Sequence, residues 1–361
     1  MKKIVIAEDC AGLGTASYAL DSVVRKSQFP VEVRHLYASE LDDSLRSALK
    51  HKFKFKLLLK RAGRYTKKQK GYAKKRVKDA VDIYINGFPC QPWSKQGLNQ
   101  GLKDAKKRCD GMKKGLTFVK RVRPKIFVFE QVKNFVSKQH LKIKTQFLRK
   151  LKAIKRTKHA KPLYHIREAI LQTNLVETAV AVPQIRERYF CVGLRADVKS
   201  LRRFQFPFET ALTPDVDALD KLLGLSAQHL KAEDESPRTY TEKRNWATLT
   251  KNQRTFDTAV TVVADLCQSE KFKAHFIANQ CPTITRPRAL QEAFWQVKMF
   301  NGTLVKRKIR SREYLKLQGW LMQVLMFVVV PLAATYQFWL MDVHINKIKN
   351  LPYIKSKSEL N

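Results

Sequence analysis

Five short apolar segments, each ending in small or polar residues, constrain the fold of this chain more than any other feature of its sequence. The first, KKIVIAEDCAGLGTASYAL, combines a strand-like apolar run, a glycine turn and the start of a helix. The others are VEVRHLYASELDD, AVDIYINGFPC, RPKIFVFEQVKNF and QIRERYFCVGLR. Strands that alternate with segments of helical length predict an α/β fold with a mainly parallel sheet.

Polar and small residues follow the predicted strands at equivalent positions. Gly12 and Gly14 follow the first strand, Glu40 the second and Cys90 the third, and Glu130 ends the fourth. In an open α/β sheet the ligand binds outside the carboxyl ends of the strands. We therefore expect these five residues to face one site.

The glycine turn allows the backbone to approach a ligand, and a carboxylate such as Glu40 at the end of the next strand can accept hydrogen bonds from ribose hydroxyls. The dinucleotide pattern G-x-G-x-x-G is incomplete because Ser17 occupies its last position. This motif alone is also compatible with a tight turn that serves only packing.

Cys90 lies between Pro89 and Gln91-Pro92, so two fixed φ angles leave the thiol little freedom to withdraw. A stiff loop at a strand end near cations suits a nucleophilic cysteine. A small buried hydrophobe is the alternative for any cysteine, and it fits Cys191 better, while Cys10 and Cys109 are expected to be structural.

The charge of the chain points to a polyanionic partner. Lysine and arginine number 71 against 31 acids, which gives a formal charge of +40. Residues 50–78 hold 14 cations and no acid, and residues 142–161 hold nine cations. Both runs are expected to contact nucleic-acid phosphates, although a basic surface that only aids solubility is the alternative.

Cysteine usage indicates a reducing compartment. The six cysteines are scattered, with no C-x-x-C pair and no metal-ligand spacing, and no signal peptide precedes them. We expect an intracellular protein without a metal, located in the nucleus of a eukaryote and otherwise in the cytoplasm or nucleoid.

The loop GFPCQPWS resembles the nucleophile loop of the cytosine-5 DNA methyltransferases, which use S-adenosylmethionine. EDCAGLGTASYAL resembles the cofactor motif of that family, ASELD its ribose-binding acid, and FVFEQVKNF its glutamate motif. VPQIRERYFCVGLR carries its Q-x-R-x-R, and CPTIT and REYLKLQGW resemble the segments that return from the target-recognition domain. Several motifs in the family's order make a chance match improbable.

The resemblance implies a Rossmann-like methyltransferase sheet with a second, smaller target-recognition domain. The expected domains are 1–196 for catalysis and cofactor binding, 197–280 for target recognition, and 281–361 for a segment that completes the catalytic domain. A monomer is expected, with DNA and S-adenosylmethionine as partners. The implied cofactor-binding residues are Cys10, Ala11, Gly12, Leu13, Gly14, Glu40 and Pro89.

The resemblance also implies the chemistry. The Cys90 thiolate adds to C6 of cytosine, a protonated or hydrogen-bonding Glu130 carboxyl stabilises N3 and N4, and Arg188, with Arg186 beside it, holds the O2 side. The cytosine must be flipped out of the duplex to be reached. The substrate loops are expected to include Gln91, Ser94 and Gln184.

The chain departs from the family pattern at four places. Cys10 replaces an aromatic residue that stacks on adenine, Gln131 replaces an asparagine, and Arg64 stands where an acid often binds the adenine amino group. Leu325 and Met326 replace glycine and asparagine of the last motif. These changes leave open a catalytically impaired nucleic-acid-binding relative, and RNA, such as tRNA, is a further alternative substrate.

The fourth departure lies in an uncharged run of 25 residues, Leu317 to Met341, which is long enough to cross a bilayer. Pro331 and the alignment with the last motif favour a buried strand and helix over such a hydrophobic anchor.

Overall fold

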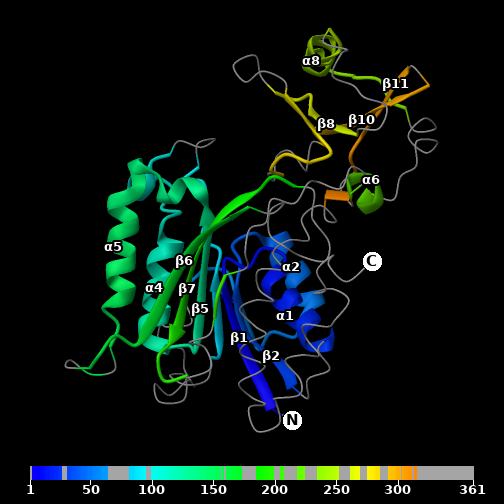
Figure 1. Ribbon diagram of the computed structural model, residues 1–361. Coiled ribbons are helices and arrows are strands. Elements are labelled where there is room, and N and C mark those ends of the chain that lie inside the picture. Colours follow the sequence, from blue (N-terminus) through cyan, green and yellow to red (C-terminus); the bar gives the residue numbers. More distant parts are fainter. Residues whose placement is uncertain are drawn as a thin grey trace, which may run out of the picture. The chain divides into compact units, whose positions relative to one another are not determined.

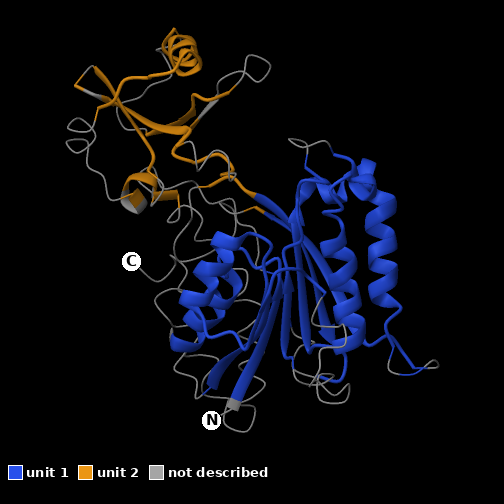
Figure 2. Cartoon of the chain, turned by 180° about the vertical axis from the view of Figure 1, so that it is seen from behind, with its two compact units in different colours: residues 1–171, 187–207, 321–361 blue, residues 172–186, 208–320 orange. Residues whose placement is uncertain are grey.

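The computed structural model describes most of the chain up to residue 314, in two compact units shown in Figure 2. Unit 1 comprises residues 1–171, 187–207 and 321–361, and unit 2 comprises 172–186 and 208–320. The described residues are 2–26, 31–63, 81–94, 99–155, 157, 160–172, 184–198, 204–206, 218–223, 234–251, 261–268, 275–284, 292–301, 303–310, 313 and 314.

Unit 1 is built on a seven-stranded sheet in the order β3-β2-β1-β4-β5-β7-β6. The pairings of β1 with β2 and β4, of β2 with β3 and of β4 with β5 are parallel, and β7 is antiparallel to β5. The strands are β1 (Lys2–Asp9), β2 (Val31–Ser39), β3 (Leu57–Leu59), β4 (Ile83–Asn86), β5 (Ile126–Val132), β6 (Tyr164–Gln172) and β7 (Glu187–Arg195).

Helices cover both faces of this sheet, α1 and α2 on one side and α4 and α5 on the other (Figure 1). The strand order reverses direction at β1, and right-handed crossovers then place the helices on opposite faces. The helices are α1 (Thr15–Lys26), α2 (Asp43–Lys52), α4 (Asp110–Val122) and α5 (Leu141–Lys152), with 3₁₀ turns η2 (Gly101–Lys103), η3 (Lys133–Val136) and η4 (Lys138–His140).

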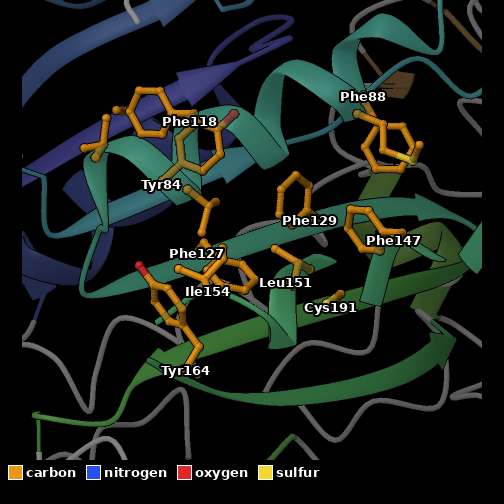
Figure 3. Close-up of a cluster of buried hydrophobic side chains, with 14 of the residues drawn as sticks. Tyr84, Phe88, Phe118, Phe127, Phe129, Phe147, Leu151, Ile154, Tyr164 and Cys191 are labelled. Carbon is orange, nitrogen blue, oxygen red and sulfur yellow. The ribbon is translucent and has the colours of Figure 1, made fainter. Parts of the chain in front are cut away.

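An aromatic core fills the space between the sheet and α4 and α5 (Figure 3). Phe129 of β5 meets Phe147 of α5 edge to face, with ring centroids 5.0 Å apart, and Tyr84 of β4 stacks on Phe118 of α4 at 4.1 Å. Cys191 lies fully buried in this cluster, as its apolar surroundings in the sequence predicted. Such a core fixes the sheet that carries the polar residues described below.

Unit 2 contains a four-stranded antiparallel sheet in the order β11-β10-β8-β9. Its elements are α6 (Ala218–Leu223), α8 (Tyr240–Thr250), β8 (Val262–Asp265), β9 (His275–Ala278), β10 (Phe294–Phe300) and β11 (Thr303–Lys308). Side chains alternate along β8: Val263 packs in a cluster with Leu219 of α6, and Val262 in one with Leu249 of α8.

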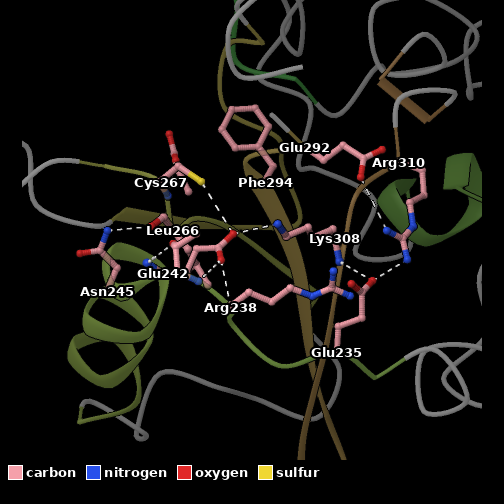
Figure 4. Close-up of polar contacts among 12 residues, drawn as sticks. Glu235, Arg238, Glu242, Asn245, Leu266, Cys267, Glu292, Phe294, Lys308 and Arg310 are labelled. Carbon is pink, nitrogen blue, oxygen red and sulfur yellow. Dashed lines mark hydrogen bonds and ion pairs between the residues drawn. The ribbon is translucent and has the colours of Figure 1, made fainter. Parts of the chain in front are cut away.

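Glu242 joins α8 to the sheet of unit 2 (Figure 4). It forms a capping box with Thr239 and an ion pair of 2.9 Å with Lys308. Burial by itself raises the pKa of this carboxyl, but the backbone N–H of Thr239 and the Lys308 ammonium outweigh it and lower the pKa to about 2. Glu242 is therefore a structural anion of this unit.

The α/β class and the mostly parallel sheet predicted from the sequence are confirmed. The borders expected at 197 and 281 stay predictions, and the compact units group the chain differently, with 172–186 and 208–320 together. The uncharged run at 317–341, where a hydrophobic anchor was the less favoured alternative, and the last motif lie outside the described residues, as does Arg64. In the described part of the chain, no helix is long and apolar enough to span a membrane.

Candidate active site

The turn between β1 and α1 lies beside Glu40. Gly12 has a φ of +58°, and a Cβ added there would meet nothing within 4 Å, so its surface is open. The Gly12 N–H donates to Glu40 Oε2 at 2.8 Å, and the Asp42 N–H donates to Oε1 at 2.9 Å. Leu13 is 45% exposed at the tip of the turn. The structure thus brings together the two motifs that the sequence assigned to a cofactor.

A buried carboxylate, Asp9, fixes the base of this turn. It accepts hydrogen bonds from Tyr37, from Ser39 Oγ at 2.6 Å and from Tyr84 at 2.7 Å. Ser39 directly precedes Glu40, and its carbonyl accepts the N–H of Ala11 at 3.0 Å. Strands β1, β2 and β4 are therefore tied together at the edge where the turn and Glu40 lie.

Cys10 follows Asp9 and is partly buried. Burial, and then the carboxylates of Asp9 and Glu40, raise the pKa of its thiol, so Cys10 remains neutral at pH 7. It offers a soft apolar surface to the turn and is not activated as a nucleophile.

The loop after β4 exposes Cys90 and is anchored by buried aromatic side chains on either side of it. Phe88 and Trp93 are buried, and the Trp93 ring lies edge to face against Phe135 with centroids 5.0 Å apart. The N–H groups of Trp93 and Ser94 both donate to the Cys90 carbonyl at 2.9 Å, which closes a tight turn. Gln91, in this turn, is exposed. The thiol is thus presented on an anchored loop.

Glu130 and Arg188 form an ion pair at the same edge of the sheet, with Arg188 Nε 2.9 Å from Glu130 Oε1. The antiparallel register of β5 and β7 pairs Val132 with Arg188, which brings the guanidinium next to the carboxylate. A Cβ placed on Gly87 would lie 3.6 Å from Glu130 Oε2, so the carboxylate borders the start of the Cys90 loop. An exposed thiol, a carboxylate and a cation thus share one edge.

Arg186 and Gln184 belong to unit 2, whereas Arg188 belongs to unit 1. Arg186 donates to the Ile284 carbonyl at 3.3 Å, and Gln184 pairs in a β-bridge with Cys281. The Gln184 side chain is buried, and its two polar atoms have no hydrogen-bond partner in the part of the chain that the structure describes. The Q-x-R-x-R motif is therefore divided between the two units.

Gln131 was identified in the sequence only as a departure from a family pattern, and the structure gives it a role. Its side chain is buried, and its Nε2 donates to the Phe88 carbonyl at 2.8 Å. Gln131 thus fixes the loop that carries Cys90 to β5, the strand that also carries Glu130.

Arg108 was missed by sequence reasoning. Asp104 holds it through a bond of 3.1 Å to Nε and raises the pKa of the guanidinium, and Cys90 raises it further. The Arg108 guanidinium and the Cys90 sulfur therefore lie within electrostatic reach of each other. The four-residue spacing from Asp104 to Arg108 was a local signal for this ion pair, but nothing in the sequence linked it to Cys90.

Comparison with known proteins places this geometry in a family. The sequence profile of the C-5 cytosine-specific DNA methylases matches residues 5–323, which include every element of the edge just described. The chain belongs to the C-5 cytosine-specific DNA methylase family. The resemblance found in the motifs is thus confirmed.

Individual relatives are distant. The Type II methyltransferase M.Bsp6I of Bacillus sp. strain RFL6 is 26% identical over 71% of this chain and 72% of its own length. M.FnuDI of Fusobacterium nucleatum is 29% identical over 35% of this chain, and the match spans about a third of that relative (33%). The crystal structure of the S. pombe Dnmt2 methyltransferase aligns with 96% of this chain and all of its own (100%), with 14% identity and a TM-score of 0.42.

The residues around the β1 turn fit a nucleoside cofactor. The open surface at Gly12 leaves room for a ligand against the backbone, and the Glu40 carboxylate uses one acceptor site of each oxygen on N–H groups, leaving others for hydroxyls. Within the described ranges, no three or more His, Cys, Asp or Glu side chains are grouped to hold a metal.

Proposed function

We propose that this chain transfers a methyl group from S-adenosylmethionine to C5 of cytosine in DNA through a covalent bond between Cys90 and C6. The observation that carries the proposal is the Glu130–Arg188 pair beside the loop that exposes Cys90. Family membership supports the reaction class, and the charge of +40 supports a nucleic-acid substrate.

The chemistry needs a nucleophile because C5 of cytosine is itself unreactive. Addition of the Cys90 thiolate to C6 breaks the C5–C6 double bond and moves the electron pair toward N3 and O2. The Glu130 carboxyl accepts a hydrogen bond from the N4 amino group and, when protonated, donates one to N3, and Arg188 stabilises charge at O2. The ion pair holds both groups in position before the base arrives, which limits reorganisation during the reaction.

The turn at Cys10, Ala11, Gly12, Leu13 and Gly14, with Glu40 and Pro89, would hold S-adenosylmethionine. When bound, the cofactor supplies the methyl group that becomes attached to C5. Removal of the C5 proton by a base then restores the double bond and expels the Cys90 thiolate. Because C6 is shielded inside a stacked duplex, the cytosine is flipped out to meet the sulfur.

The test is transfer of labelled methyl groups from S-adenosylmethionine to cytosine-rich duplex DNA. We expect label on DNA with the unmodified chain and none with Cys90→Ser. The matched control is Cys267→Ser, which changes a partly exposed thiol of unit 2 and should keep the activity.

A second experiment repeats the methyl-transfer assay with tRNA in place of DNA. A third measures how tightly the protein binds duplex DNA, independently of methyl transfer. Label on tRNA alone would assign the chain to RNA. DNA binding without label under any condition would identify a nucleic-acid-binding relative that lacks methyl transfer, and would refute the proposal.

A further inference from the structure

A basic hollow lies on the outer face of α5, apart from the residues of the candidate active site. It has a volume of about 530 Å³ and is open to solvent. The side chains that line it are three cations, two polar groups and one exposed leucine: Lys138, Lys142, Arg149, Thr145, Gln146 and Leu141.

Helical periodicity explains why these residues share one face. Phe147, Leu148 and Leu151 turn inward to the core of unit 1, and positions 141, 142, 145, 146 and 149 fall on the opposite, exposed face of the helix. The nearby acid Glu168 of β6 binds Lys144 at 2.8 Å. Lys138, Lys142 and Arg149, by contrast, form no ion pair with any residue that the structure describes.

The hollow extends away from the catalytic edge. Residue 138 follows β5 closely, at the end that carries Glu130, and α5 then runs back along the sheet (Figure 1). Arg149 is eleven positions after Lys138, which corresponds to about 18 Å at 2.0 Å per residue through η4 and 1.5 Å per residue along α5. One DNA strand presents about five phosphates over that length, at 3.4 Å each.

We propose that this hollow is a second nucleic-acid contact, which binds phosphodiester groups of a duplex outside the catalytic edge. The three cations neutralise phosphates, Thr145 and Gln146 donate hydrogen bonds to phosphate oxygens, and Leu141 packs against deoxyribose. None of these contacts reads a base, so the surface increases affinity for any sequence. The inference rests on the proposed function only in taking DNA as the partner.

The test is the salt dependence of duplex binding, measured by fluorescence anisotropy without cofactor. The variant is Lys138→Gln with Lys142→Gln and Arg149→Gln. Loss of three phosphate contacts should reduce the slope of log K against log salt by about 2.7 and weaken binding at 0.1 M salt by two orders of magnitude or more. A second variant, with Lys138→Arg, Lys142→Arg and Arg149→Lys, should retain the slope because the charges remain.

The matched control removes the same net charge from three exposed cations on β1, α1 and α4, outside the hollow: Lys3→Gln, Arg25→Gln and Lys120→Gln. It should leave the slope near that of the unmodified chain. If the slope falls equally in the α5 glutamine variant and in the control, the effect comes from the net charge of the protein and the proposal is overturned. The proposal is also overturned if the slope changes in neither variant.

The outcome is separable from that of the methyl-transfer test. If no cytosine is methylated but the α5 variant alone loses salt-dependent binding, the second contact stands and the proposed reaction fails. If methylation occurs and the slope is unchanged in the α5 variant, the reaction stands and the second contact fails.

Discussion

Replacing Gln131 by asparagine, the residue usual in this family, is expected to impair this chain. Gln131 Nε2 donates to the Phe88 carbonyl at 2.8 Å, across 43 residues of sequence. Removing one carbon–carbon bond withdraws the amide by up to about 1.5 Å. The donor–acceptor distance then exceeds the limit of about 3.2 Å for an N–H···O bond.

The energetic cost follows from burial. Phe88 is 2% exposed and Gln131 is 1% exposed, so water does not replace the lost donor. An unpaired buried carbonyl costs about 1 to 3 kcal/mol, which corresponds to a Tm decrease of about 2 to 12 °C for a domain of this size. A misplacement of the Cys90 loop by about 1 Å can reduce the chemical rate about 100-fold.

Two measurements check this reasoning: calorimetry for Tm, and the single-turnover rate of methyl transfer at saturating cofactor and DNA. The alkylation rate of Cys90, followed by peptide mass spectrometry, adds a readout of loop position that does not depend on catalysis. The control is Gln100→Asn, the same chemical change at an exposed position. A Gln131→Asn variant with unchanged Tm and full rate would show that the hydrogen bond does not hold the loop.

Three further predictions test other parts of the site. Burial raises the pKa of Glu8 from 4.5 to about 7, against weaker opposing effects of Ser17 and His35. Folding therefore favours the protonated acid, and stability falls as pH rises from 4.5 through 7; relative to Glu8→Gln, chemical denaturation should show a loss of about 3 kcal/mol over this range. Glu40→Gln should weaken S-adenosylmethionine binding at least about 10-fold in calorimetric titrations, since the charged acceptor of the Gly12 N–H is lost; unchanged affinity would remove Glu40 from the cofactor site. Arg188→Lys should lower the single-turnover rate about 100- to 1,000-fold without changing duplex affinity, because the guanidinium bond to Glu130 is lost; a loss of affinity alone would assign Arg188 to DNA binding.

The candidate site was predictable where its signals were local. The glycine turn and Glu40 end consecutive strands, and parallel strands bring their carboxyl ends to one edge, so their contact could be expected from sequence. The place of β7 in the sheet could not be predicted from the sequence, because its antiparallel pairing with β5 depends on the order of strands that are distant along the chain. The 3.6-residue period of α5 was also a local signal, although the hollow on its outer face was recognised only in the structure.

The sequence by itself determined the stiff frame of Cys90, since the prolines at 89 and 92 fix φ without any tertiary contact. It also determined the alternation of strands and helices, because hydrophobic periodicity selects secondary structure locally. Only the tertiary structure decided the partners: Arg188 for Glu130, Gln131 for the Phe88 carbonyl, and unit 2 for Arg186. Those contacts depend on strand order and register, which arise from packing the whole sheet.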